Sequence, residues 1–428
     1  MEKIKISEVG ETFYKEKLDN GLEIYMLPKN DFTETYVTFT TRFGSINTEF
    51  IPIEKNKMVK VHNGIAHFLE HKVFEMEDGV DPFDFYSKNG ASCNASTTFN
   101  KTTYLYIGPG HLKENVNYLL DYVQSIYLTE ENIEKEKGII EQEINMYKDD
   151  PFWNLYEGIL AAAFKENNMR NPIAGEVEDI MKITKDELMD CYNTFYNPSN
   201  MFIVATGRFN PEELVSIIRE NQEKKNYKKI DKIVVKNFEE PDSVVKEKVE
   251  LTKSISESKI ALAFKISKKK IDLKDKFKLN RYLSILLEVL FGSTSLFVSE
   301  ARNKKILTDS GFEIMNSDSH YLPCLFLESS NPDEIINMAK EKINSLDITE
   351  EDFERRKKVM ISAYISSFDK IVSINEMIVA NVMNYDDYIH DQIKRIKELD
   401  YEEFMNIIKS IDFSNVSSVV IKPSEKSN

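Results

Sequence analysis

The chain carries an internal repeat. Residues 348–364 align without a gap on residues 128–144, and both segments begin with an apolar residue followed by Thr-Glu-Glu. This is the pattern of a helix start with a Thr cap and acidic residues in the first turn. The apolar positions pair as Ile133 with Phe353, Ile139 with Val359, and Ile140 with Met360. Because 428 residues are too many for one hydrophobic core, the repeat predicts two homologous domains.

The expected linker between the domains is residues 226–245, which are rich in lysine and interrupted by Pro241. We therefore expect an N-terminal domain at residues 1–225 and a C-terminal domain at residues 246–428. In the first domain, alternation and turn signals predict strands on both sides of Asn20-Gly21, at 35–43 and within 91–107, and helices at 81–88, 111–126 and 128–147.

The first domain also contains the run His67-Phe68-Leu69-Glu70-His71, inside a stretch without proline that predicts a helix. Residues four apart lie on one face of a helix, so His67 and His71 can present both imidazoles to one divalent ion. Glu70 lies beside them and is suited to act as a general base rather than as a ligand. Histidines on a helix are also often simply packed, and a catalytic zinc needs three protein ligands, so the hypothesis requires a third ligand.

The helix expected at 128–147 supplies candidates for this ligand. On a period of 3.6 residues its apolar face carries two carboxylates, since it comprises Ile133, Glu136, Ile139, Ile140, Glu143 and Tyr147. Glu141 points away from this face. A buried Glu is rare unless it is paired or bound to a metal. Glu143 is thus the best third ligand, and Glu136 is either a partner that supports the site or an alternative ligand.

The second copy of the repeat lacks these candidate metal-binding residues. Arg356 stands at the position of Glu136, and Ala363 stands at that of Glu143. The segment Ile285-Leu286-Leu287-Glu288-Val289, which corresponds to residues 67–71, has no histidine. We therefore expect one metal ion per chain, held by the first domain alone.

Composition excludes some partners. A net charge of −16 argues against nucleic acid and against an anionic membrane surface, and favours a neutral or basic peptide. The first residues lack an apolar signal segment, so we expect a cytoplasmic protein. The three cysteines, Cys93, Cys191 and Cys324, are odd in number and widely spaced, which predicts reduced and mostly buried thiols.

At this point the sequence resembles the insulinase/pitrilysin family of inverzincin zinc metallopeptidases, and in particular its bacterial two-domain, processing-peptidase-like members, which act as dimers. The resemblance covers most of the chain and is strongest between residues 61 and 208. It rests on His67-x-x-Glu70-His71, on Gly90-Ala91-Ser92-Cys93-Asn94-Ala95, on Glu136 and Glu143 seven residues apart, and on Tyr196-Asn197-Pro198-Ser199-Asn200-Met201.

The resemblance implies an α+β fold in which two homologous domains, each an antiparallel sheet packed by helices, face each other around a chamber. It implies Zn²⁺ held by His67, His71 and Glu143, with Glu70 as general base and Glu136 supporting the site. It also implies that Asn94, Ala95 and Ser96 belong to an edge strand that pairs with an extended substrate. The expected function is that of a zinc endopeptidase that cleaves short or unfolded peptides.

The sequence departs from the family in the second half. Active members carry an Arg and, seven residues later, a Tyr that bind the substrate backbone. Arg302 matches, but Asp309 stands at the Tyr position. We therefore expect a dimer in which a homologous subunit supplies the Arg and Tyr. The alternative is a scaffold or peptide-binding subunit of the same fold that has lost catalysis.

Overall fold

The computed structural model describes residues 1–424, and these residues form two compact units. The first unit comprises Met1–Ile144, Pro172–Asn237 and Tyr364–Asp391, and the second comprises Asn145–Asn171, Phe238–Ala363 and Gln392 onward. Each unit is therefore built from segments that lie far apart in the sequence.

The first unit is organised on a seven-stranded sheet. Its strands lie in the order β1 (Glu2–Ile6), β2 (Glu11–Lys17), β3 (Glu23–Pro28), β9 (Met201–Gly207), β4 (Glu34–Thr41), β8 (Thr102–Pro109) and β7 (Ser92–Thr97). A small separate sheet joins β5 (Glu49–Phe50) and β6 (Val59–Lys60). All neighbours in the large sheet are antiparallel except β3 and β9. The fold is thus α+β. The sheet was expected to be antiparallel, and it differs from that expectation in the parallel pair of β3 and β9.

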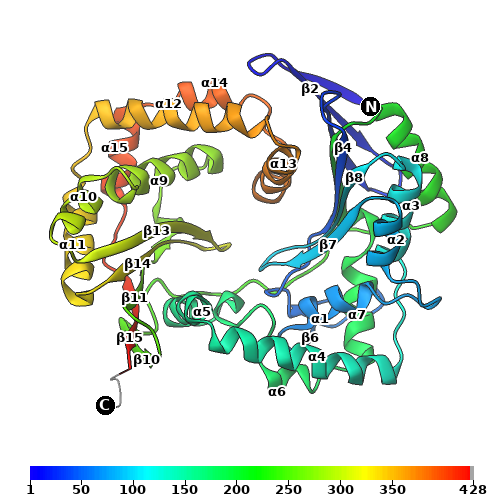
Figure 1. Cartoon of the computed structure of the whole chain (residues 1–428), viewed down its shortest axis with the longest axis horizontal. Coiled ribbons are helices and arrows are strands. Elements are labelled where there is room, and N and C mark those ends of the chain that lie inside the picture. The colour runs from blue at the N-terminus through cyan, green and yellow to red at the C-terminus, as the bar shows by residue number, and fades with distance from the viewer. Residues whose placement is uncertain (425–428) are drawn as a thin grey trace. The chain divides into compact units, whose positions relative to one another are not determined.

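Helices cover both faces of this sheet. Figure 1 shows α3 (Leu112–Val123) and α8 (Pro211–Lys225) on one face and α13 (Ile371–Tyr385) on the other. The remaining helices of the unit are α1 (Ile65–Val73), α2 (Pro82–Lys88), α6 (Val177–Ile180), α7 (Lys185–Phe195) and the first part of α4 (Glu130–Asp149). Asp81 caps α2 immediately before Pro82, and Thr184 forms a capping box with Glu187 at the start of α7.

The second unit contains a six-stranded sheet. Its strands are β10 (Lys248–Lys253), β15 (Val416–Pro423), β11 (Ser258–Phe264), β14 (His320–Ser329) and β12 (Ile266–Ser267), with β13 (Leu307–Asn316) also paired to β14. Only β10 and β15 run parallel. Its helices are α5 (Pro151–Ala163), α9 (Lys276–Phe291), α10 (Leu296–Asn303), α11 (Pro332–Ser345), α14 (Gln392–Lys397), α15 (Tyr401–Ser410) and most of α12 (Glu350–Ser367).

Each unit also includes one helix from the opposite half of the sequence. In the first unit, the buried Asn375 of α13 donates to Val204 O at 2.9 Å and accepts from Thr38 Oγ1 at 2.9 Å. In the second unit, α5 packs on β15 and β11. The predicted division at 226–245 includes the change of unit after Asn237, but α5 and α13 do not follow it. The cause is tertiary, because both helices are amphipathic segments whose partner sheets lie far away in the sequence.

Residues 276–303 are long and apolar enough, by length and composition alone, to resemble a membrane-spanning helix. In the structure they form two helices, α9 and α10, separated after Phe291, and 61% of the most apolar window is buried within the fold. Such burial is what a core helix shows.

The predicted elements of the first domain are present, and the expectation that all three cysteines are reduced and buried is confirmed. One detail of α4 was wrong. Ile139, which we placed on the buried face, is 44% exposed, whereas Ile133, Ile140 and Ile144 are buried. The buried face follows positions 133, 136/137, 140 and 144, so Ile139 lies at its edge.

Candidate metal centre

The position of α1 is set by tight contacts at its start. Gly64 caps this helix with φ +83°, and a Cβ atom there would lie 2.4 Å from the carbonyl oxygen of Ala174. Only glycine fits both the backbone conformation and the available space. Just before it, His62 Nδ1 contacts Glu187 Oε1 of α7 at 2.8 Å. The His67 to His71 segment is thereby held in a defined place in the first unit.

The three predicted ligands come together between α1 and α4. Potential donor atoms of His67, His71 and Glu143 all lie within 4.8 Å of one another. His67 Nε2 is 3.7 Å from Glu143 Oε1, and His71 Nε2 is 3.4 Å from Glu143 Oε2. All three belong to the first unit. Among residues 1–424 this is the group of His, Cys, Asp and Glu side chains whose geometry suits a metal ion.

Glu136 contacts the opposite side of the second histidine. Its Oε1 lies 3.0 Å from His71 Nδ1. From the sequence, Glu136 was expected either to support the site or to serve as an alternative ligand. In the structure it faces Nδ1 of His71, the ring nitrogen that points away from Glu143. This is the place of a carboxylate that orients a ligating histidine.

The two histidines have opposite electrostatic surroundings. Burial, together with the neighbouring His71, lowers the pKa of His67 to about 4, so its imidazole is neutral at pH 7. Burial also opposes protonation of His71, but the contacts with Glu136 and Glu143 outweigh it and raise the pKa of His71 to about 9. In the metal-free chain a proton on His71 thus supplies the positive charge that the carboxylates attract.

Glu70 is half-buried beside this group. The hydroxyl of Thr97, on β7, donates to its Oε2 at 2.5 Å. Burial raises the pKa of Glu70 above its ordinary value, although the Thr97 hydrogen bond acts in the opposite direction. A carboxylate of raised basicity is what a general base near neutral pH requires.

The residues present fit a zinc ion. Two imidazole nitrogens and one carboxylate form the set that catalytic zinc sites use, with a further position left for water or substrate. The contact of 3.7 Å between His67 Nε2 and Glu143 is too long for a hydrogen bond. A divalent cation could be bound between these atoms.

The predicted substrate strand lies at a sheet edge. Strand β7 is the last strand of the seven-stranded sheet and is hydrogen-bonded to β8. Asn94 and Ser96 are exposed, and Ala95 is half-buried. Such an edge offers backbone groups to an added strand.

The two residues of the expected substrate clamp belong to the second unit. Arg302 lies on α10 and Asp309 lies on β13, and both are exposed. Asp309 Oδ1 accepts a hydrogen bond from the N–H of Ser310.

The second unit has an ion pair where the first has the metal group. Arg356, the counterpart of Glu136, lies 3.3 Å from the carboxylate of Glu288 and also donates to Thr294 Oγ1. Glu288 corresponds to Glu70 in the aligned segments. In the second unit, the positive charge beside the carboxylate of Glu288 therefore comes from Arg356. In the first unit, the corresponding place would be taken by a metal cation.

Sequence reasoning missed two residues of the site, Lys72 and Thr97. Lys72 is wholly buried, with its Nζ 3.8 Å from Glu136 Oε2. Helical periodicity was a signal for Lys72, since it shares a face with the buried Phe68 and Leu69. Strand alternation was a signal for Thr97, since it lies two residues beyond Ala95 and therefore on the same face of β7.

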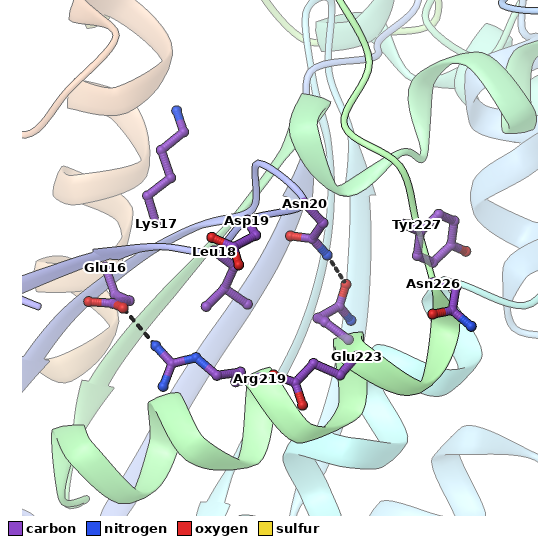
Figure 2. A pocket seen from close by; sticks show the side chains of 10 residues that line it. Glu16, Lys17, Leu18, Asp19, Asn20, Arg219, Glu223, Asn226 and Tyr227 are labelled. Carbon is purple, nitrogen blue, oxygen red and sulfur yellow. Dashed lines mark hydrogen bonds and ion pairs between the residues drawn. The ribbon is translucent and has the colours of Figure 1, made fainter.

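A surface pocket of about 480 Å³ lies elsewhere in the first unit, between the β2–β3 turn and α8 (Figure 2). Arg219 in it pairs with Glu16 at 2.7 Å, and Asn20 pairs with Gln222 at 3.1 Å. None of its lining residues belongs to the metal group. We assign this pocket no role.

Two family models and a solved structure match this chain. Residues 59–177 match the model of the insulinase family, peptidase family M16, and residues 182–360 match the model described as the peptidase M16 inactive domain. A solved structure of an M16-like peptidase from Alicyclobacillus acidocaldarius is 30% identical, with a TM-score of 0.91 over 97% of this chain and 99% of that one.

Curated relatives agree over shorter spans. The uncharacterized zinc protease YmfH of Bacillus subtilis is 52% identical over 224 residues, which are 52% of each chain. The beta subunit of the human mitochondrial-processing peptidase is 28% identical over 162 residues, 37% of this chain and 33% of that one. The chain thus spans about half or less of the length of these relatives in the matched regions.

The fold is that of the two-domain α+β peptidases, in which sheets are packed by helices. The chain belongs to the insulinase family, peptidase family M16.

Proposed function

We propose that this protein is a zinc-dependent endopeptidase that cleaves short or unfolded peptides. The observation that carries the proposal is the convergence of His67, His71 and Glu143 within 4.8 Å, with the half-buried Glu70 on the same helix as the two histidines. The names of relatives such as YmfH, a zinc protease, support the choice of metal.

His67 Nε2, His71 Nε2 and a carboxylate oxygen of Glu143 would hold the ion. Zinc in such a site supplies Lewis acidity that makes water a stronger acid and polarises a carbonyl group. Glu70 would take the proton from the attacking water and return it to the leaving amine nitrogen. Thr97 holds one oxygen of Glu70, so the other remains for this transfer.

The substrate would bind as an added strand on β7. Backbone hydrogen bonds along Asn94, Ala95 and Ser96 would give affinity without strong sequence preference. This mode requires an extended chain, which is why the proposed substrates are short or unfolded peptides.

Partner dependence is a further part of the proposal. The exposed Asp309 carries a negative charge where the clamp needs a tyrosine, so Arg302 alone provides half of the clamp. We expect a dimer in which a homologous subunit supplies the missing Arg and Tyr.

The test is a cleavage assay on an unfolded, fluorogenic peptide, with zinc content measured in the same preparation. We expect one zinc per chain, weak cleavage by the purified chain alone, and strong cleavage after addition of a homologous subunit that carries the Arg and Tyr. Strong cleavage by the chain alone would refute the partner requirement. A chain with one zinc that shows no cleavage with any partner would instead support the scaffold alternative.

A further inference from the structure

A lysine lies fully buried behind the metal group. Lys72 follows His71 on α1, and its side chain has no exposed surface. Its ammonium donates to the carboxylate of Glu75 and to the carbonyl oxygen of Asn132 at 3.2 Å. Burying an ammonium group is costly unless it is paired and hydrogen-bonded. This desolvation cost indicates that the positive charge of Lys72 has a structural or functional role.

The charge faces the carboxylate that orients His71. Lys72 Nζ lies 3.8 Å from Oε2 of Glu136, while Oε1 of the same carboxylate contacts His71 Nδ1 at 3.0 Å. Lys72 therefore lies between two carboxylates, Glu75 and Glu136. Without it, the like charges of Glu75 and Glu136 would repel each other, and Glu136 would move away from His71.

The second half of the chain gives an internal comparison. Leu290 occupies the position of Lys72 in the aligned segments, and it is fully buried in α9. An apolar residue therefore satisfies the packing requirement at this place. The lysine occurs where its neighbour is Glu136, and it is absent where that neighbour is Arg356, which would repel it.

We propose that Lys72 is a positioning residue, which acts through Glu136 to hold His71 in the orientation that binds the metal. The inference rests on the proposed zinc function and adds a residue to the site. Lys72 touches neither substrate nor metal ligand atoms, so its effect reaches the ion only through Glu136 and His71.

The experiment measures zinc affinity by competition with a chromogenic chelator, so no substrate or partner subunit is needed. Lys72→Met should weaken zinc binding about 10- to 100-fold, the range found for residues that orient metal ligands. The visible spectrum of the cobalt-substituted protein should change as well, because the geometry around His71 changes.

Lys137→Met is the matched control. Lys137 is also a buried lysine, paired with Glu134 three residues earlier on α4. Its variant removes the charge of another buried lysine from the same pair of helices and leaves Glu136 unchanged. We expect zinc affinity within threefold of the wild type.

A double variant separates the proposed route from a direct effect of charge. In a Glu136→Gln background, Lys72→Met should change zinc affinity no further, because its intermediary is absent. This comparison also remains possible if Lys72→Met alone does not fold, since the double variant removes both members of the pair.

The outcomes are distinct. Unchanged or tighter zinc binding in Lys72→Met, or an equal loss in the Glu136→Gln background, would overturn the role of Lys72 while leaving the zinc site intact. A wild-type chain that binds no zinc would instead overturn the proposed function, and this inference with it.

Discussion

His71 Nδ1 lies 3.0 Å from Glu136 Oε1, while His71 Nε2 faces Glu143 Oε2 at 3.4 Å. One imidazole thus bridges two carboxylates of α4 that are seven residues apart. Because Glu136 accepts the proton at Nδ1, Nε2 is the ring nitrogen that would bind a metal ion, on the side of Glu143. The packing of α1 against α4 thereby places the two glutamates beside different nitrogens of the His71 ring.

Glu143→Gln should abolish metal binding, because a neutral amide is a poor zinc ligand. We expect zinc to fall from one per chain to less than about a tenth of that value, measured by elemental mass spectrometry. Glu141→Gln on the same helix is the control and should keep its zinc. Full zinc occupancy in the Glu143 variant would mean that this residue is not a ligand.

Glu70→Gln should keep its zinc but lower kcat for peptide cleavage about 10²- to 10⁴-fold, the usual contribution of a general base. The assay includes the homologous subunit that we propose as the partner. Zinc content and the thermal unfolding midpoint serve as controls for folding. Cleavage at the wild-type rate would exclude Glu70 from the proton transfer.

Glu240→Gln should destabilise the second unit. Glu240 accepts from the N–H groups of residues 165–167 and from Lys265, and neither member of this ion pair has exposed side-chain surface. Leaving Lys265 buried without its counter-ion should cost about 3–5 kcal/mol at pH 7. The measurement is the thermal unfolding midpoint, with the exposed Glu239→Gln as a control that should not change.

The loss of stability caused by Glu240→Gln should depend on pH. Burial alone would raise the pKa of Glu240, but the hydrogen bonds from Lys265 and the backbone outweigh it and hold this pKa below the ordinary value of 4.5. The stabilisation is therefore complete above pH 4.5 and is lost as the pH falls through the lowered pKa. The difference between wild type and Glu240→Gln should narrow in acid, and a constant difference would argue against this ion pair.

Ile140→Ala should cost about 2–4 kcal/mol, because Ile140 is fully buried on α4. Ile139→Ala should change stability by less than about 0.5 kcal/mol, because Ile139 is largely exposed. Urea unfolding of both variants checks the assignment of the helix face. Equal losses of stability in the two variants would mean that Ile139 lies on the buried face of α4, as the sequence predicted.

Much of the site followed from local patterns. The spacing of His67 and His71 and the seven-residue spacing of Glu136 and Glu143 are properties of single helices, and helical periodicity is readable from the sequence. The repeat showed that the second half lacks these groups. Ile139 was misplaced because the apolar stripe of α4 is narrower than periodicity alone suggests.

The sequence by itself determined the elements of the first domain, the family, and the residues that can bind a metal, because these depend on short-range spacing. Only the tertiary structure decided that Lys72 is buried against Glu136, that Thr97 of β7 holds Glu70, and that α5 and α13 each join a sheet distant in the sequence. These relationships depend on contacts between distant segments. Such contacts leave no regular spacing in the sequence, because burial and pairing are settled only when the elements pack together.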